Sequence, residues 1–259
     1  MMLLLILSLI HGCWSLTGVN LRVPSVVRTG DSLRMTCEYK LEKESLYSVK
    51  FYQGDQEFYR YVPKESPPTQ VFALEGIKVD LSQSNSSSVT ISDVQRELTG
   101  FYKCEVSADA PLFHTGIKAA LVIVTEDPIS LPVVTVEKYK FSLNEKVRAN
   151  CTSQGGYPAA NLTWYVNKNQ QVKSSPLVRV HPLVTRNVGG LDTTQTQLEL
   201  DATPNFFVDG RLRLRCVATQ FTVYRRSTEL ELQEDTPQLA PVMGPTPAQN
   251  RDSGSADVP

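Results

Sequence analysis

The spacing of the cysteines is the feature that most limits how this chain can fold. Four of the five cysteines form two pairs with nearly equal gaps, 67 residues from Cys37 to Cys104 and 65 residues from Cys151 to Cys216. Four cysteines allow three pairings, but two matched gaps indicate a repeated unit in which each copy has its own disulfide. In the chain-entropy model, closing a loop of this size stabilises a fold by about 4 kcal/mol.

The fifth cysteine, Cys13, lies in an N-terminal segment typical of a secretory signal peptide. Residues 3–10 form an apolar run shorter than the roughly 20 residues that span a bilayer, and small residues follow it. We expect a signal peptide over residues 1–18, with cleavage between Ser15 and Val19. Its removal would leave four cysteines in a compartment where disulfides persist. A buried N-terminal strand is the alternative.

After residue 19 the sequence has the period of short strands separated by turn residues, with no sustained helical period. Apolar residues occupy alternate positions around every remaining cysteine. The clearest such stretches are residues 33–39, 102–106, 147–151 and 212–216. Short strands that surround one central cysteine pair are typical of an immunoglobulin sandwich.

Single residues support this interpretation in both halves of the chain. Tyr102 stands two residues before the second cysteine of the first half, where the tyrosine corner of this fold belongs. Trp164 follows the first cysteine of the second half by 13 residues, at the place of the core tryptophan. Phe51 replaces that tryptophan in the first half, and Leu214 replaces the tyrosine in the second half. Apolar replacements of this kind are tolerated in a core.

We therefore predict an all-β chain of two tandem immunoglobulin-like β-sandwiches, the first V-like and the second C/I-like. The first domain is expected over residues 19–126 and the second over residues 127–234. Residues 125–132 contain two prolines and suit a short, stiff linker. Residues 235–259 are polar, and we expect this tail to be disordered because it has too little apolar surface to bury.

Two long segments of the first domain carry a closer resemblance. They are LYSVKFYQGDQEFYRYVPKESPP at residues 46–68 and KCEVSADAPLFHT at residues 103–115. Both resemble the beaten path family of arthropod neuronal immunoglobulin proteins. The resemblance covers the whole first domain and extends more loosely through the second domain as far as RLRLRCVA, residues 211–218.

The resemblance implies expression in the nervous system and a role in axon guidance and selective adhesion. It implies that the partner is a transmembrane immunoglobulin receptor of the sidestep family and that the first domain recognises it. Some members of the family are anchored and others are secreted. The polar end of this chain matches the secreted kind, without a direct membrane anchor.

A candidate binding face lies on the strands that carry Phe51 and Cys104. Because these two residues face inward, their neighbours point outward, and tyrosine and arginine are enriched at binding hot spots. On the next strand, EFYRY, the outward pair is either Phe58 and Arg60 or Tyr59 and Tyr61, and we favour the first. The predicted partner-binding residues of this face are Lys50, Tyr52, Phe58, Arg60, Lys103 and Glu105. The alternative is a mixture of core and scattered surface residues.

A second candidate is the loop at residues 108–115. Leu112 and Phe113 would stand at its tip and could insert into a pocket of the partner. The alternative is that both tuck under the end of the sandwich.

The second domain contains a row of arginines at period two, Arg211, Arg213 and Arg215. Alternate strand residues are about 6.6 Å apart, so these charges would line up on one face. Guanidinium groups bind sulfate and carboxylate well, which makes heparan sulfate a candidate ligand. A solvated charged face is the favoured alternative. A homophilic adhesion module is a further alternative for the whole protein.

Three sequons predict N-glycosylation, at Asn85, Asn150 and Asn161. Asn85 lies in a polar run and is the best candidate. Asn150 adjoins a cysteine and Asn161 precedes a strand, so we expect both to be less accessible.

Composition and motifs argue against catalysis, cofactors and nucleic acid. The net charge is −1, which gives no general attraction to nucleic acid or acidic membranes. The sequence contains no Gly-x-Ser-x-Gly or Cys-x-x-Cys, and beyond the N-terminal segment its histidines are His114 and His181. We therefore expect a binding protein without a metal site rather than an enzyme.

Overall fold

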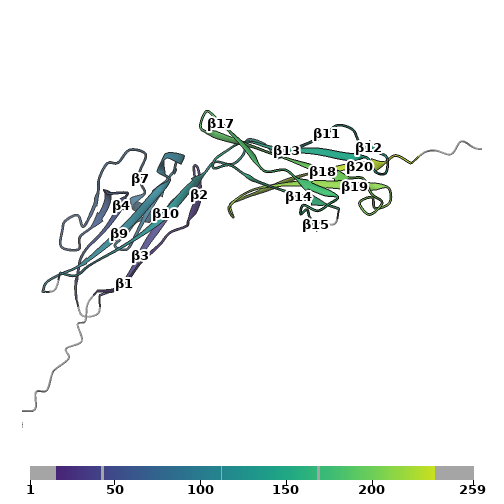
Figure 1. Ribbon diagram of the computed structural model, residues 1–259. Helices are drawn as coiled ribbons and strands as arrows, with labels where there is room; N and C mark the ends of the chain where they lie inside the picture. The colour runs from purple at the N-terminus through teal and green to yellow at the C-terminus, as the bar shows by residue number, and fades with distance from the viewer. Residues whose placement is uncertain (1–15, 42–43, 112, 168–169, 237–259) are drawn as a thin grey trace, which may run out of the picture.

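The computed structural model describes residues 16–41, 44–111, 113–167 and 170–236. They form two β-sandwiches that lie end to end, with a bend between them (Figure 1). In the part of the chain that is described, no helix is long and apolar enough to cross a membrane.

The first sandwich packs a four-stranded sheet against a six-stranded sheet. The four-stranded sheet has the order β1 (Thr17–Arg22), β3 (Leu33–Lys40), β8 (Ser88–Ser92) and β7 (Lys78–Val79). The six-stranded sheet has the order β2 (Val26–Arg28), β10 (Thr115–Thr125), β9 (Gly100–Ala108), β4 (Leu46–Gln53), β5 (Gln56–Tyr61) and β6 (Thr69–Val71). Two short 3₁₀ helices, η1 (Leu81–Gln83) and η2 (Arg96–Leu98), complete the domain.

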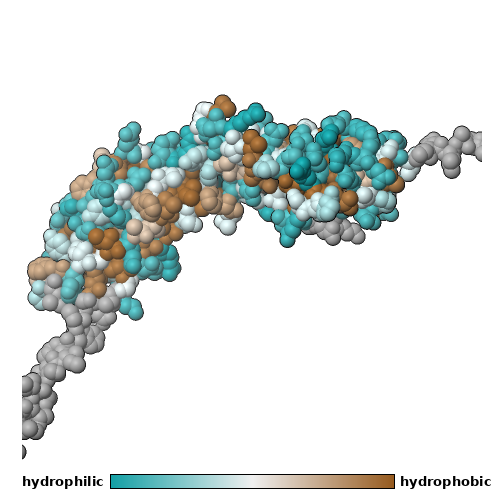
Figure 2. Space-filling model, in the orientation of Figure 1, coloured by the Kyte–Doolittle hydropathy of each residue, from teal (hydrophilic) through white to brown (hydrophobic). Residues whose placement is uncertain are grey.

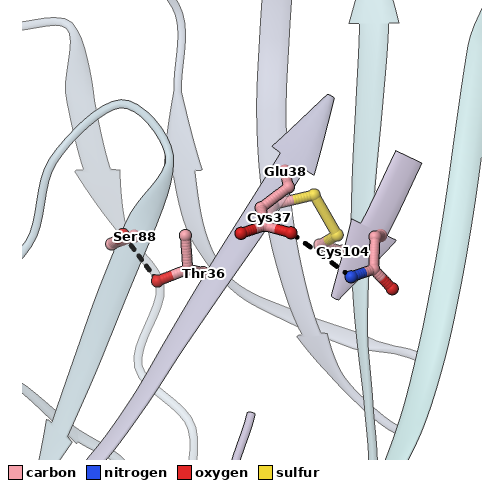
Figure 3. Close-up of a disulfide and its surroundings, with 6 residues drawn as sticks. Thr36, Cys37, Glu38, Ser88 and Cys104 are labelled. Atoms are coloured by element: carbon pink, nitrogen blue, oxygen red, sulfur yellow. Dashed lines mark hydrogen bonds between the residues drawn. A yellow bond between two sulfur atoms is a disulfide. The ribbon is translucent and has the colours of Figure 1, made fainter. Parts of the chain in front are cut away.

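The Cys37–Cys104 disulfide joins the two sheets of the first sandwich from β3 to β9 (Figure 3). Beside it, the hydroxyl oxygens of Thr36 and Ser88 lie 2.9 Å apart and tie β3 to β8. Tyr102 is fully buried, and its hydroxyl donates a 2.8 Å hydrogen bond to the carbonyl oxygen of Leu98. Burial raises the pKa of Tyr102 to about 12, so its hydroxyl remains a donor at neutral pH.

The second sandwich repeats this arrangement. One sheet has the order β11 (Val133–Val136), β13 (Lys146–Gly156), β18 (Leu191–Asp201) and β16 (Val178–Val180), and β17 (Val184–Val188) also pairs with β18. The other has the order β12 (Lys140–Phe141), β20 (Tyr224–Glu234), β19 (Arg211–Gln220), β14 (Asn161–Val166) and β15 (Gln170–Gln171). The Cys151–Cys216 disulfide and the buried Trp164 lie in its core.

These observations confirm the predicted fold class and both disulfides. Phe51 and Leu214, the apolar replacements, are fully buried, which is why each core tolerates the exchange. Strand β1 already includes Thr17, two residues before the expected start of the first domain at residue 19. Strand β20 ends at Glu234, where we expected the second domain to end. Residues 1–15 of the predicted signal peptide and most of the predicted tail lie outside the described residues.

The linker between the domains forms backbone hydrogen bonds with the second sandwich. Glu126 and Tyr157 exchange two backbone hydrogen bonds of 2.7 and 2.9 Å, and the amide of Ile129 donates to the carbonyl of Gln154 at 2.9 Å. Ile129 also occupies the space that a side chain at Gly155 would need, since a Cβ there would lie 2.3 Å from its Cδ1. The linker therefore packs as an extra edge of the second domain.

Arg96 of η2 connects the first domain to the linker and to the second domain. Its guanidinium donates a 2.8 Å hydrogen bond to the carbonyl of Gly190, at the turn between β17 and β18. The same group lies 5.3 Å from the ring centroid of Tyr157 and 3.8 Å from the carboxylate of Glu126. One side chain thus contacts the linker and two segments of the second domain. Arg28 adds a second link, since its guanidinium contacts Asp127 of the linker and donates to the carbonyl of Val223.

Replacing Arg96 by alanine is expected to loosen the angle between the sandwiches without unfolding either domain, because the lost contacts all lie at the junction. Small-angle X-ray scattering of the Arg96→Ala protein should show a broader distribution of interatomic distances than the wild type. The matched control is Arg34→Ala, which removes an exposed arginine from β3, away from the junction. Superimposable scattering curves for wild type and Arg96→Ala would contradict this role.

Candidate recognition surface

The outer face of the six-stranded sheet in the first domain brings together most of the predicted binding residues. Strand pairing places Lys50 opposite Glu105 and Arg60, and Tyr52 opposite Lys103. Their neighbours Phe51 and Cys104 are fully buried, so these side chains point away from the core. We call this surface the β4–β9 face. Its polar part consists of Lys50, Tyr52, Asp55, Glu57, Arg60, Lys103 and Glu105.

Glu105 is the centre of the polar part. Its carboxylate lies 3.2 Å from the ammonium of Lys50 and accepts a hydrogen bond of 3.2 Å from the hydroxyl of Tyr52. Desolvation, followed by the negative charge of Glu105, raises the pKa of Tyr52, so the phenol remains protonated and donates. Lys50 and Glu105 are only 23% and 19% exposed, which holds the pair in one arrangement.

The two other cations of the β4–β9 face also have carboxylate partners. The Lys103 ammonium lies 2.6 Å from Asp55, and the Arg60 guanidinium lies 2.7 Å from Glu57. Arg60 also lies 5.2 Å from the ring centroid of Phe72, a cation–π contact. Because each positive charge has a negative neighbour, the face as a whole carries no strong charge of either sign.

The prediction for Phe58 was wrong, because its side chain is fully buried. Strand β5 pairs Tyr59 with Phe51 and Glu57 with Tyr52, which leaves Phe58 as the extra residue of a β-bulge. The bulge lets Phe58 and Tyr59 both point into the core, where Phe58 packs edge-on against Tyr102. An inward Phe58 and an outward Arg60 therefore coexist on one strand.

An apolar strip on the same face was not expected from the sequence. Phe101 on β9 is 60% exposed, and Leu121 on β10, its direct partner across the strands, is 44% exposed. Ile117, 55% exposed, continues the strip along β10 through the exposed Ala119. Figure 2 shows hydrophobic residues gathered on this part of the first domain, over β10 and β2. We call Phe101, Ile117, Ala119 and Leu121 the apolar strip.

The loop after β9 fits the prediction in part. Phe113 is 65% exposed, so it does not tuck under the sandwich, while Leu112 lies outside the described residues. Phe113 has a φ of 51°, in the left-handed region that a non-glycine residue adopts at some cost. The loop tip therefore presents one aromatic ring to solvent at the end of the first domain.

Two of the three arginines in the row of the second domain have carboxylate partners. Arg211 and Arg213 lie 3.4 and 3.0 Å from Glu231 on β20. The guanidinium of Arg215 lies 5.0 Å from the ring centroid of Tyr165. A polyanion would have to compete with Glu231 for Arg211 and Arg213. Heparan sulfate binding stays an untested prediction.

The three sequon asparagines differ in exposure. Asn85 is exposed, and its side-chain oxygen accepts hydrogen bonds from the amides of Ser87 and Ser88, which leaves the nitrogen directed away from them. Asn161 is also exposed, so the expected low accessibility does not hold there, and Asn150 is partly exposed. Asn85 belongs to the loop before β8, and β8 lies in the sheet opposite the β4–β9 face.

Family models identify both domains. The immunoglobulin V-set domain matches residues 22–123, and the CD80-like C2-set immunoglobulin domain matches residues 128–220. The chain is therefore an immunoglobulin-superfamily protein with a V-set domain followed by a C2-set domain. Both matches are to binding domains rather than enzymes, and the disulfides in both indicate an extracellular protein.

One protein is similar to this chain in sequence, and two solved structures are similar to it in fold. Cell adhesion molecule 3 of Xenopus laevis is 28% identical over 170 residues, which cover 63% of this chain and 39% of that protein. The crystal structure of murine CEACAM1b has a TM-score of 0.59 at 14% identity, and covers 83% of this chain and 100% of its own. A murine receptor complexed with the mouse coronavirus receptor-binding domain has a TM-score of 0.58 at 14% identity, with 83% and 98% covered. The two structures show the shared fold alone, whereas the sequence relative is an adhesion protein.

Proposed function

We propose that this protein is a secreted recognition protein whose first domain binds a transmembrane immunoglobulin receptor through the β4–β9 face. The observation that carries the proposal is the pairing of the exposed apolar strip with the fixed polar network beside it. Protein interfaces have this anatomy, an apolar centre that is desolvated on binding and a polar rim that sets orientation. Exposed apolar patches of this kind mark interaction sites.

The position of the sequons supports the same face. The only sequon of the first domain is at Asn85, in the loop that leads into β8 of the opposite sheet, so a glycan there would leave the β4–β9 face free. The resemblance of residues 46–68 and 103–115 to the beaten path family supports a receptor of the sidestep kind and a role in axon guidance. Adhesion by the Xenopus relative is in keeping with such a role.

A cell-surface binding screen tests the proposal. The purified full chain is applied to cells that each display one immunoglobulin receptor of the same nervous system, and bound protein is quantified. We expect binding to one or a few sidestep-like receptors. Because the charges of the face are paired internally, this binding should weaken only modestly between low and physiological salt.

Two outcomes of the screen would overturn the proposal. Binding only to cells that display this same chain would indicate homophilic adhesion instead. Binding that disappears after heparan sulfate is removed from the cells would indicate a glycan ligand and would point to the second domain.

A further inference from the structure

A shallow groove of about 250 Å³ crosses the outer surface of the second domain, on the sheet that contains β13, β18 and β17. Its lining includes Asn150, His181, Pro182, Val184, Arg186 and Gln197. The groove lies where one edge of the sheet is interrupted, because β16 ends at Val180, β17 begins at Val184, and both pair with β18. Apolar and polar side chains thus lie next to each other along one channel.

Asn150 reaches this groove from the middle of β13. Its neighbours Ala149 and Cys151 are fully buried, so the Asn150 side chain points outward, and it is partly exposed. It begins the sequon Asn-Cys-Thr, which we expected to be less accessible because a cysteine adjoins it. The alternation of the strand removes that objection, because the burial of Cys151 is what turns Asn150 toward solvent.

Strand β17 borders the same groove and forms an exposed edge of the sheet. All five of its residues are exposed, and Val184 and Val188 are 54% and 74% exposed. Among the described residues, β17 pairs with β18 alone, so its other edge presents free backbone groups. Proteins cover such edges because they otherwise pair with other chains.

We propose that Asn150 carries an N-linked glycan whose first sugars occupy this groove and shield β17. In the secretory pathway, the side-chain nitrogen of Asn150 loses a proton and forms a bond to C1 of the first N-acetylglucosamine. The bond that breaks joins C1 to the pyrophosphate of the lipid-linked oligosaccharide donor, and the lipid pyrophosphate leaves. Pro182 and Val184 contact the apolar faces of the sugar rings, while Gln197 and Arg186 offer hydrogen bonds to their hydroxyl and acetamido groups.

The first test is site occupancy in the full chain secreted from eukaryotic cells. Enzymatic release of the glycans in ¹⁸O-labelled water converts each occupied asparagine to labelled aspartate, which mass spectrometry of the peptides detects. We expect the label at Asn150. An unlabelled Asn150 in a secreted protein that is labelled at Asn85 would overturn the proposal.

The second test asks whether the sugars lie in the groove. Glycans are trimmed to the first N-acetylglucosamine, and hydrogen exchange of residues 183–188 is compared with that of Asn150→Gln and of Thr152→Ala. Thr152→Ala removes the sequon and leaves Asn150 in place. We expect exchange in β17 to be roughly threefold faster in both variants, and unchanged in the control Asn161→Gln, which alters the opposite sheet. Equal exchange in trimmed protein and both variants would show that the sugar does not occupy the groove.

Discussion

Replacing Phe101 by alanine should weaken binding of the receptor by at least about 30-fold, the equivalent of a hot-spot loss of roughly 2 kcal/mol. Phe101 is 60% exposed in the free protein and faces Leu121 across the strands. A partner that covers the apolar strip would bury both side chains. The free energy gained from that burial is lost on truncation, whereas the fold loses little because Phe101 lies outside the core.

Receptor-binding measurements on two further variants test the polar part of the β4–β9 face separately from the apolar strip. Tyr52→Ala should cost more than about 1 kcal/mol, since it removes an aromatic ring and one of the two donors to Glu105. Lys103→Glu should mainly slow association, because it sets a negative charge beside Asp55 at the rim. Affinities are measured by surface plasmon resonance on variants with unchanged melting temperature.

Two controls match these variants. Phe113→Ala removes an equally exposed aromatic from the loop tip, and Arg213→Ala changes the second domain. Neither should alter the affinity if the β4–β9 face binds the receptor. If Phe101→Ala, Leu121→Ala and Tyr52→Ala all bind as tightly as the wild type, the site must lie elsewhere, with the Phe113 loop as the first place to look.

The fold could be predicted because its determinants are local. The matched cysteine gaps, the tyrosine before Cys104 and the tryptophan after Cys151 each constrain a short stretch of chain. Strand alternation then placed Lys50, Tyr52, Lys103 and Glu105 on one face, which the register confirms. The inference needed only the inward positions of Phe51 and Cys104, which the immunoglobulin pattern supplies.

The predictions of side-chain direction and exposure failed where one extra residue in a strand, or contacts with a distant segment, decide them. The bulge at Phe58 adds one residue to β5, and one residue reverses the side to which a strand side chain points. The exposed Leu121 gave no signal because it lies in a continuous apolar run, residues 119–124, where no alternation with polar residues marks the outward side. Phe101 did carry a signal, since it alternates with Lys103 and Glu105 on the outward side of β9.

Two further features depend on contacts between distant segments. The neutralising carboxylates of the arginine row, Glu229 and Glu231, alternate on β20 and could have been noticed, but their register against β19 could not be known. The contact of Arg96 with Gly190 joins residues 94 positions apart in different domains. No local pattern indicates such a contact, and the stiffness expected of the linker came from its prolines alone.

Removal of the first-domain disulfide by Cys37→Ala and Cys104→Ala together should destabilise that domain by about 4 kcal/mol in the chain-entropy model. The bond joins β3 to β9, and β9 carries Phe101, Lys103 and Glu105. For a domain of roughly 100 residues, this loss lowers the melting temperature by more than about 15 °C, because 1 kcal/mol corresponds to at least about 4 °C. Receptor binding should disappear at the temperature where the first domain unfolds.

The matched control is the double variant Cys151→Ala and Cys216→Ala, which opens a loop of nearly the same length in the second domain, 65 against 67 residues. Calorimetry should show the lower transition in the first domain for one variant and in the second domain for the other. At low temperature, where the first domain remains folded, both variants should bind the receptor. Above the lowered transition of the first domain, only the second-domain variant should still bind. A single transition that shifts equally in both variants would mean that the Arg96 junction couples the sandwiches into one cooperative unit. Binding that is lost equally in both variants would place part of the recognition surface on the second domain.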